Sequence, residues 1–216
     1  MKITDGDTNL IRAFELVSQC WLEVTELAKT LDELFEEKLW KLPPDFEMKY
    51  DGNSVVEYRT DESDYLFTDL AKSFPLKKKF SSKSAPPDMY IGYQVSLLGD
   101  GIFPDVKAPL IHVFFWECKA DFNDFYFSFP PREDSSPSLD SSRLFVWGES
   151  EPSKWTERQW SFSIKLTDMN NRQNLLNSVV EPALSLLGRA SAKVALPDDL
   201  PGLVLYPLNV LPPSTE

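Results

Sequence analysis

The chain has 216 residues, which suits one domain, and 42% of them are hydrophobic, which excludes global disorder. Its 34 acidic and 22 basic residues give a net charge of −12, and such a field repels phosphate, so a general nucleic-acid binder is not expected. Two widely separated cysteines and the lack of a signal-peptide core or a long apolar run predict a soluble cytoplasmic protein with reduced thiols and no membrane partner.

The segment from Asn9 to Trp40 has the clearest periodicity in the chain. Apolar residues recur at alternating steps of four and three, and acidic residues fill the other face, which predicts an amphipathic helix of roughly thirty residues. Pro43-Pro44 should end it. We expect the stripe to pack on the domain's own sheet, and a helical homodimer interface is the alternative. The stripe contains Leu10, Phe14, Val17, Trp21, Val24, Ala28, Leu31 and Phe35, flanked by Ala13, Cys20, Leu27 and Leu34.

Residues 45–89 are predicted to hold a hairpin, a short helix and a basic loop. Alternation around Asp51-Gly52 within residues 46–60 is a hairpin signal. Leu66 and Leu70 are four apart, which favours a short helix over residues 62–73. Five lysines and one aspartate give residues 72–89 a net charge of +4. The lysines at 77–79 could hold a phosphate or an acidic partner, lie in a solvated loop, or neutralise the protein's own acidic helix.

From residue 90 to residue 167 the pattern indicates strands with short connections, which favours antiparallel neighbours. Strands are expected over residues 90–98, 110–117, 122–129, 144–147 and 159–166, with a polar loop over 130–142. The segment Leu110–Glu117 is apolar on both faces, so we expect a central strand covered on both sides.

The C-terminal part is predicted to contain a helix over residues 168–190, which Pro182 should kink or divide, and an extended Leu/Pro-rich tail over 191–216. These elements together predict one α+β domain over residues 1–216. In it, a long N-terminal helix within residues 1–44 and a C-terminal helix pack on a mainly antiparallel sheet of about five to seven strands.

One motif has a catalytic interpretation. Pro104-Asp105 is followed after eleven residues by Glu117-Cys118-Lys119, which resembles the PD-(D/E)xK pattern of metal-dependent nucleases. The resemblance covers residues 104–119 and implies that Asp105 and Glu117 hold Mg²⁺ or Mn²⁺ while Lys119 orients or activates water. The family's following helix is missing, because residues 122–129 have a strand pattern. A strand end with solvated charges is the alternative interpretation.

Other catalytic centres lack the residues they need. His112 is the only histidine and stands among apolar residues, so we expect a core or sheet-face residue rather than a base. No nucleophile elbow, P-loop or dinucleotide motif is present, and two cysteines with one histidine, all far apart, make no zinc site. We therefore expect no cofactor.

The leading hypothesis is a non-enzymatic protein-binding module of the immunity, inhibitor or adaptor type, with a basic protein as partner. The nuclease is the second hypothesis, and an aromatic-lined small-molecule pocket between helix and sheet is the third. Partner binding would use the acidic helix face, the lysines, and tryptophans beside the polar loop 148–153, although a solvated helix face and buried tryptophans are the alternatives. The candidate contact residues are Glu23, Glu26, Glu33, Glu37, Lys77, Lys78, Lys79, Trp147 and Trp155.

Overall fold

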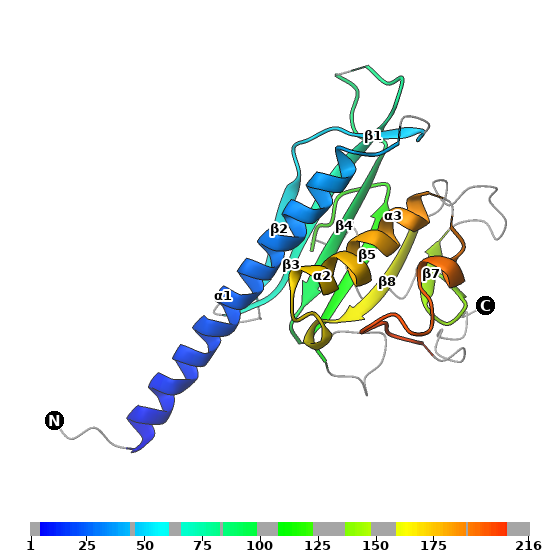
Figure 1. Ribbon diagram of the computed structural model, residues 1–216. Coiled ribbons are helices and arrows are strands. Elements are labelled where there is room, and N and C mark those ends of the chain that lie inside the picture. The colour runs from blue at the N-terminus through cyan, green and yellow to red at the C-terminus, as the bar shows by residue number, and fades with distance from the viewer. Residues whose placement is uncertain are drawn as a thin grey trace, which may run out of the picture.

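The structure is a computed structural model that describes residues 5–43, 46–60, 66–82, 84–98, 108–122, 137–147, 159–188 and 190–206 (Figure 1). The elements in chain order are α1 (Asp5–Leu39), β1 (Met48–Tyr50), β2 (Val55–Thr60), β3 (Phe67–Lys78), β4 (Met89–Ser96), β5 (Leu110–Trp116), β6 (Ser138–Asp140), β7 (Leu144–Trp147), β8 (Gln159–Lys165), the 3₁₀ turn η2 (Leu166–Asp168), α2 (Arg172–Leu175), the π-helical turn η3 (Leu176–Val180), α3 (Glu181–Leu187) and α4 (Ala192–Ala195).

Eight strands form one sheet in which every pairing is antiparallel. The order is β1-β3-β4-β5-β8-β7-β6, and β2 pairs with β3 off this path. β5 lies between β4 and β8, and its residues from Leu110 to Phe115 are buried whichever face they point to. The predicted α+β class, the antiparallel sheet and the doubly covered central strand are therefore confirmed.

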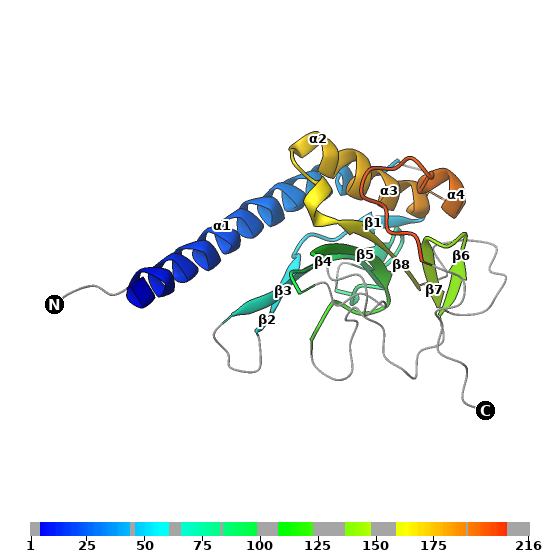
Figure 2. The ribbon, with the colours of Figure 1, turned by 90° about the horizontal axis from the view of Figure 1, so that it is seen from below.

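The helices lie together on one face of the sheet, as Figure 2 shows from below. The predicted apolar stripe of α1 contacts this face through its C-terminal half, where Val24, Ala28, Leu31 and Phe35 are buried in the main core. The ring of Phe35 stacks at 5.2 Å from that of Phe74 on β3. Packing on the chain's own sheet is therefore confirmed for this half of the helix.

The opposite face of the sheet carries a second apolar cluster and a row of buried polar side chains. Ala71, Leu110, Phe114 and Phe145 belong to the cluster. The C-terminal segment runs alongside β8, where the amide of Val204 donates to the carbonyl of Ser163, and the side chains of Val204 and Tyr206 join this cluster. Both faces of the sheet therefore have a core of their own.

Two local predictions for residues 45–89 are wrong. β1 and β2 do not pair with each other as a hairpin, because both lie along the same edge of β3, where Met48 faces Lys78 and Val55 faces Ser73. Gly52 and Asn53 between them have positive φ angles of 76° and 58°, a conformation that shifts the chain along this edge. Of the predicted helix over residues 62–73, the part from residue 67 onward belongs to β3, since a short apolar run fits both periods, and residues 62–65 lie outside the described residues.

The other boundaries differ in smaller ways. β6 lies inside the predicted loop over 130–142, and the predicted strand over 122–129 falls outside the described residues beyond Phe122. The C-terminal helix begins at Arg172, and the π turn η3 precedes Pro182. Pro182 thereby falls in the first turn of α3. The expected division of the helix does not occur, because Leu175, Leu176, Val180 and Glu181 all have right-handed helical backbone angles; the hydrogen-bonding pattern changes to a π turn just before the proline instead.

Candidate functional site

The N-terminal half of α1 extends beyond the edge of the sheet into solvent, as both ribbon views show (Figures 1 and 2). Its large apolar side chains are exposed to 54% at Ile11, 67% at Phe14, 63% at Leu16, 43% at Val17 and 65% at Leu22. Phe14 and Val17 continue the same stripe that is buried from Val24 onward. One apolar helix face is therefore covered over its second half and uncovered over its first.

The contacts that hold α1 to the body lie at Trp21 and beyond. The ring of Trp21 stacks on that of Phe67 with centroids 4.4 Å apart. Further along, Asp32 Oδ1 accepts a hydrogen bond of 2.7 Å from the Tyr93 hydroxyl, and Asp32 Oδ2 lies 2.6 Å from Lys72 Nζ. Lys38 forms an ion pair with Glu181 on α3. The anchored half of α1 is thus fixed by packing and by charge pairs.

A groove of about 770 Å³ opens where α1 leaves the body and the β8–α2 connection begins. One wall is α1, the floor is aliphatic, and the other wall is the connection from η2 into α2. The amide of Asn174 donates to Asn171 Oδ1, which caps α2 and fixes this wall. The lining residues are Cys20, Glu23, Val24, Glu26, Leu27, Thr30, Leu97, Pro109, Leu166, Thr167, Met169, Asn170, Asn171, Arg172 and Leu175.

The groove is continuous with the projecting half of α1. Leu16, Cys20, Glu23 and Leu27 are separated by steps of four, three and four, so they share one helix face. Leu16 belongs to the uncovered half, and the other three line the groove. This face, apolar at Leu16 and Leu27 with Cys20 and the carboxylate of Glu23 between them, therefore runs along α1 from solvent into the groove. We call this surface, with Leu97, Leu166 and Leu175 opposite α1, the α1 groove.

The carboxylates around the α1 groove divide into two groups. Glu23 and Glu26 are exposed and line it. Glu33 and Glu37 lie about two to four turns further along, with carboxylate oxygens 2.8 and 3.8 Å from the guanidinium of Arg172. A hydrogen bond from Lys41 and its charge lower the pKa of Glu37. Arg172 is thus engaged by α1, and the rim at Glu23 and Glu26 is acidic.

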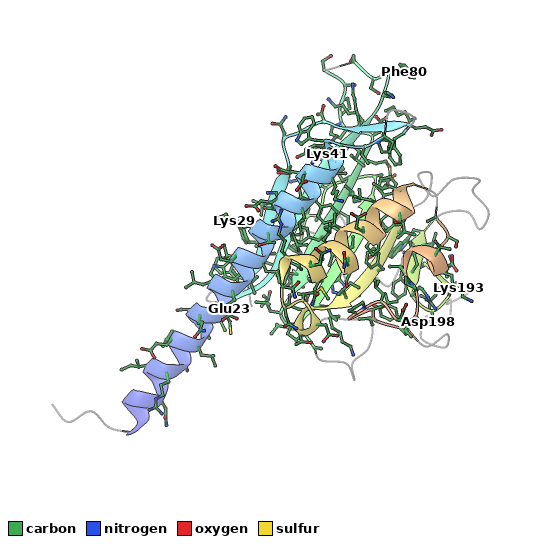
Figure 3. All side chains as sticks on the ribbon, viewed as in Figure 1. Glu23, Lys29, Lys41, Phe80, Lys193 and Asp198 are labelled. Carbon is green, nitrogen blue, oxygen red and sulfur yellow. The ribbon has the colours of Figure 1, made fainter. Side chains whose placement is uncertain are left out.

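The lysines singled out in the sequence lie elsewhere. Lys77 is buried, and its Nζ is 3.0 Å from Asp51 Oδ2. Lys78 and Lys79 are exposed at the turn after β3, beside Phe80, which Figure 3 shows at the end of the molecule remote from Glu23. The acidic helix is paired by Lys72, through Asp32, and not by the lysines at 77–79 for which this role was an alternative. The structure does not bring Lys77–Lys79 and the acids of the α1 groove together.

The tryptophans divide differently. Trp160 is fully buried and Trp147 is 8% exposed, so these two belong to the cores, which was the alternative interpretation. The edge of Trp147 packs against Trp116 with centroids 4.8 Å apart. Trp155 lies outside the described residues.

The nuclease-like motif is described only in its second half, because Asp105 lies outside the described residues. Glu117 is exposed. Lys119 Nζ lies 2.8 Å from Glu57 Oε1 on β2 and 3.7 Å from Asp121, and these carboxylates raise the pKa of Lys119. The described residues contain no group of three His, Cys, Asp or Glu side chains placed to hold a metal ion.

His112 is fully buried on β5, on the face away from the helices. Its Nδ1 lies 2.8 Å from the hydroxyl of Ser163, which accepts a hydrogen bond of 2.5 Å from Tyr206. Burial, together with the charge of Arg59, lowers the pKa of His112 to about 3. The expectation that His112 is a core residue agrees with this setting, and it stays uncharged at neutral pH.

The residues of the α1 groove that the sequence did not indicate come from the body. Leu97, Pro109 and Leu166 stand at strand ends and in connections that are distant in sequence. A search for periodic patterns does not find them, because only the folded sheet brings them beside α1. The sequence feature that points to the α1 groove is the apolar stripe of α1, because this stripe continues beyond the part of the helix that packs on the sheet.

Comparison of the chain with models of known families, with curated proteins and with solved structures finds no match. Within the part of the chain that the structure describes, no helix has the length and apolarity needed to cross a membrane.

Proposed function

We propose that this chain is a non-enzymatic protein-binding module and that the projecting half of α1 is its binding element. The observation that carries the proposal is the run of exposed apolar side chains at Ile11, Phe14, Leu16, Val17 and Leu22. Phe14 and Val17 continue the stripe that is buried from Val24 onward, whereas Ile11, Leu16 and Leu22 lie on other sides of the helix. Exposed apolar surface of this extent marks interaction sites on soluble proteins.

The energetics of an isolated helix support the same conclusion. Most of the stability of a helix in a protein comes from tertiary packing of its amphipathic face rather than from intrinsic propensity. Residues 5–20 of α1 have only the anchored half behind them for support. A partner that covers Phe14 and Val17 would extend the main core by further turns of the same stripe and stabilise the segment.

The proposal favours a partner other than a second copy of the chain. A net charge of −12 opposes self-association at long range, whereas it attracts a basic protein. The immunity, inhibitor or adaptor role expected from the sequence is a form of this proposal, in which the chain acts by occupying a surface of another protein.

The test is an affinity capture from the native host with three immobilised proteins, at moderate salt, with retained proteins identified by mass spectrometry. These are the wild type, the double variant Phe14→Gln/Val17→Gln, and the control Phe80→Gln/Val194→Gln. The control changes the same two residue types at exposed positions, since Phe80 is 99% and Val194 72% exposed.

We expect specific proteins to be retained by the wild type and by the control and to be lost with Phe14→Gln/Val17→Gln. Retention of the same proteins by both double variants would show that α1 is not the binding element. If the wild type retains nothing specific, the protein-binding proposal loses its support.

A further inference from the structure

The α1 groove has the form that a second helix requires. Leu16, Cys20, Glu23 and Leu27 make one face of α1, and Leu97, Leu166 and Leu175 face it across the groove. Leu16 and Leu27 are eleven residues apart, which is about 16 Å along a helix at 1.5 Å per residue. An amphipathic helix packs in such a site through anchors spaced at i, i+4, i+7 and i+11.

The negative charge at the rim of the groove determines which kind of helix can bind. Glu23 and Glu26 stand exposed beside the apolar floor. Arg172, a basic residue of the lining, is engaged by Glu33 at 2.8 Å. A helix lying against Leu27 and Leu166 therefore has carboxylates beside its flank, which attract lysine or arginine and repel aspartate or glutamate.

We infer that the α1 groove binds a basic amphipathic helix of a partner protein, with its apolar face on Leu16, Leu27 and Leu166 and its cationic flank on Glu23 and Glu26. This inference rests on the proposed function and adds the class of partner and its orientation. It also accounts for the position of Leu16 outside the groove, because a helix that lies along α1 from Leu27 would reach Leu16 on the projecting half.

The probe is a synthetic peptide with leucine at i, i+4, i+7 and i+11 and lysine on the flanks, compared with a peptide of the same leucine pattern that carries glutamate instead. Binding to the full chain is measured by fluorescence anisotropy at low and moderate salt. Any basic peptide is attracted to an acidic protein, so variants of the protein are needed to distinguish binding in the groove from general charge attraction. They are Glu23→Lys, Glu26→Lys and, as a control, Asp199→Lys.

Asp199→Lys changes the net charge by the same amount at an exposed position, next to Asp198, which Figure 3 shows well away from Glu23. We expect Glu23→Lys and Glu26→Lys each to weaken binding of the basic peptide about three- to tenfold, and Asp199→Lys to change it much less. Equal weakening by all three variants, or tighter binding of the glutamate peptide to the wild type, would overturn the inference.

A second readout locates the peptide without a substitution. Cys20 lines the groove and is exposed, whereas Cys118 follows β5 in a different part of the chain, and neither cysteine is in a disulfide. A peptide that saturates the groove covers Cys20. It should therefore slow alkylation of Cys20 at least threefold and leave the rate at Cys118 unchanged. Unchanged alkylation of Cys20 at saturating peptide would place the peptide elsewhere and overturn the inference.

The two proposals can fail separately. If the peptide does not bind while host proteins are still lost with Phe14→Gln/Val17→Gln, the partner is not a basic helix and the protein-binding role stands. If sedimentation shows a dimer of the isolated chain that the same double variant dissolves, the occupant is a second copy, which overturns this inference. If neither capture nor peptide binding depends on α1, both proposals are wrong.

Discussion

Buried polar side chains form a row across the sheet face that lies away from the helices. Gln94 donates to Asp69 at 2.9 Å, and on the neighbouring strands His112 and Tyr206 both contact the hydroxyl of Ser163. Buried polar groups are costly unless they are paired, so this row fixes the register of the strands as well as their stability.

His112 should make the stability of the protein depend on pH. Burial lowers its pKa in the folded state to about 3, whereas the unfolded chain takes up the proton near its ordinary value of about 6.5. Below that value the unfolded state binds a proton that the folded state does not, so stability falls by about 1.4 kcal/mol per pH unit on going down towards pH 3.

Urea unfolding of the wild type and of His112→Gln between pH 4 and pH 8 measures this contribution. We expect His112→Gln to be less stable at pH 7 by about 1–3 kcal/mol, because its hydrogen bond to Ser163 is disturbed, and to lose less stability than the wild type below pH 6. Parallel pH profiles for the two proteins would contradict the account of His112.

Gly92 on β4 should not tolerate a side chain. A Cβ there would lie 2.1 Å from the carbonyl oxygen of Lys72 and 2.5 Å from the ring of Phe114. The carbonyl belongs to the neighbouring strand and cannot move without breaking the sheet. We expect Gly92→Ala to lower the free energy of unfolding by about 3 kcal/mol or more.

Gly188→Ala is the control for this prediction in the same thermal or urea measurement. The nearest atoms to a Cβ at Gly188 are 3.3 and 3.4 Å away, and its φ of −75° suits alanine. The stability of Gly188→Ala should be unchanged or raised by about 0.4–1 kcal/mol, since alanine restricts the unfolded chain. Equal effects of the two substitutions would contradict the described packing around Gly92.

At the scale of the element, α1 contains two matched leucines in opposite settings. Leu31 is fully buried under the sheet contact, and Leu16 is 63% exposed on the projecting half. We expect Leu31→Ala to cost about 2–5 kcal/mol of stability, and Leu16→Ala to change it by no more than about 0.5 kcal/mol. Urea unfolding of the isolated chain at low concentration measures both.

A large loss of stability from Leu16→Ala would mean that the first half of α1 is already covered. Concentration dependence of that loss would assign the cover to a second copy of the chain. Phe14→Ala in the same measurement extends the comparison to the apolar stripe itself, because Phe14 is 67% exposed.

The elements show which part of the fold was accessible from sequence. α1 could be predicted because its period is local and long, and β5 because burial on both faces leaves an uninterrupted apolar run. The partners of β1 and β2 could not, because a turn at Asp51-Gly52 does not specify that both strands pair with β3. The beginning of β3 was misread because the spacing of Leu66 and Leu70 fits a helix, and only pairing with β2 and β4 decides for a strand.

Part of the candidate site could also be predicted from the sequence, because the pattern of α1 is local. Glu23 and Glu26 were found as members of an acidic helix face, and they do line the α1 groove. Glu33 and Glu37 were found with them, and Arg172 of α2, whose position depends on tertiary structure, engages both. The apolar stripe of α1 becomes exposed where the helix passes the edge of the sheet. The position of that edge depends on the strands, so it cannot be predicted from the residues of α1.

At the scale of the whole molecule, the two cores of the described residues leave the apolar side chains on the projecting half of α1 uncovered. The main core lies between helices and sheet, the second lies on the other face, and α1 passes beyond both (Figure 1). If the proposed function holds, the net charge of −12 would attract basic partners towards this surface.

Hydrogen–deuterium exchange along α1 tests this account most directly. In the isolated chain at low concentration, we expect amides of residues 11–20 to exchange on the order of tenfold or more faster than those of residues 28–39. Saturation with the basic amphipathic peptide should slow exchange from residue 16 to residue 27. Uniform protection along the whole of α1 in the isolated chain, or protection by the peptide only outside α1, would contradict the claim that the projecting half is an open protein-binding surface.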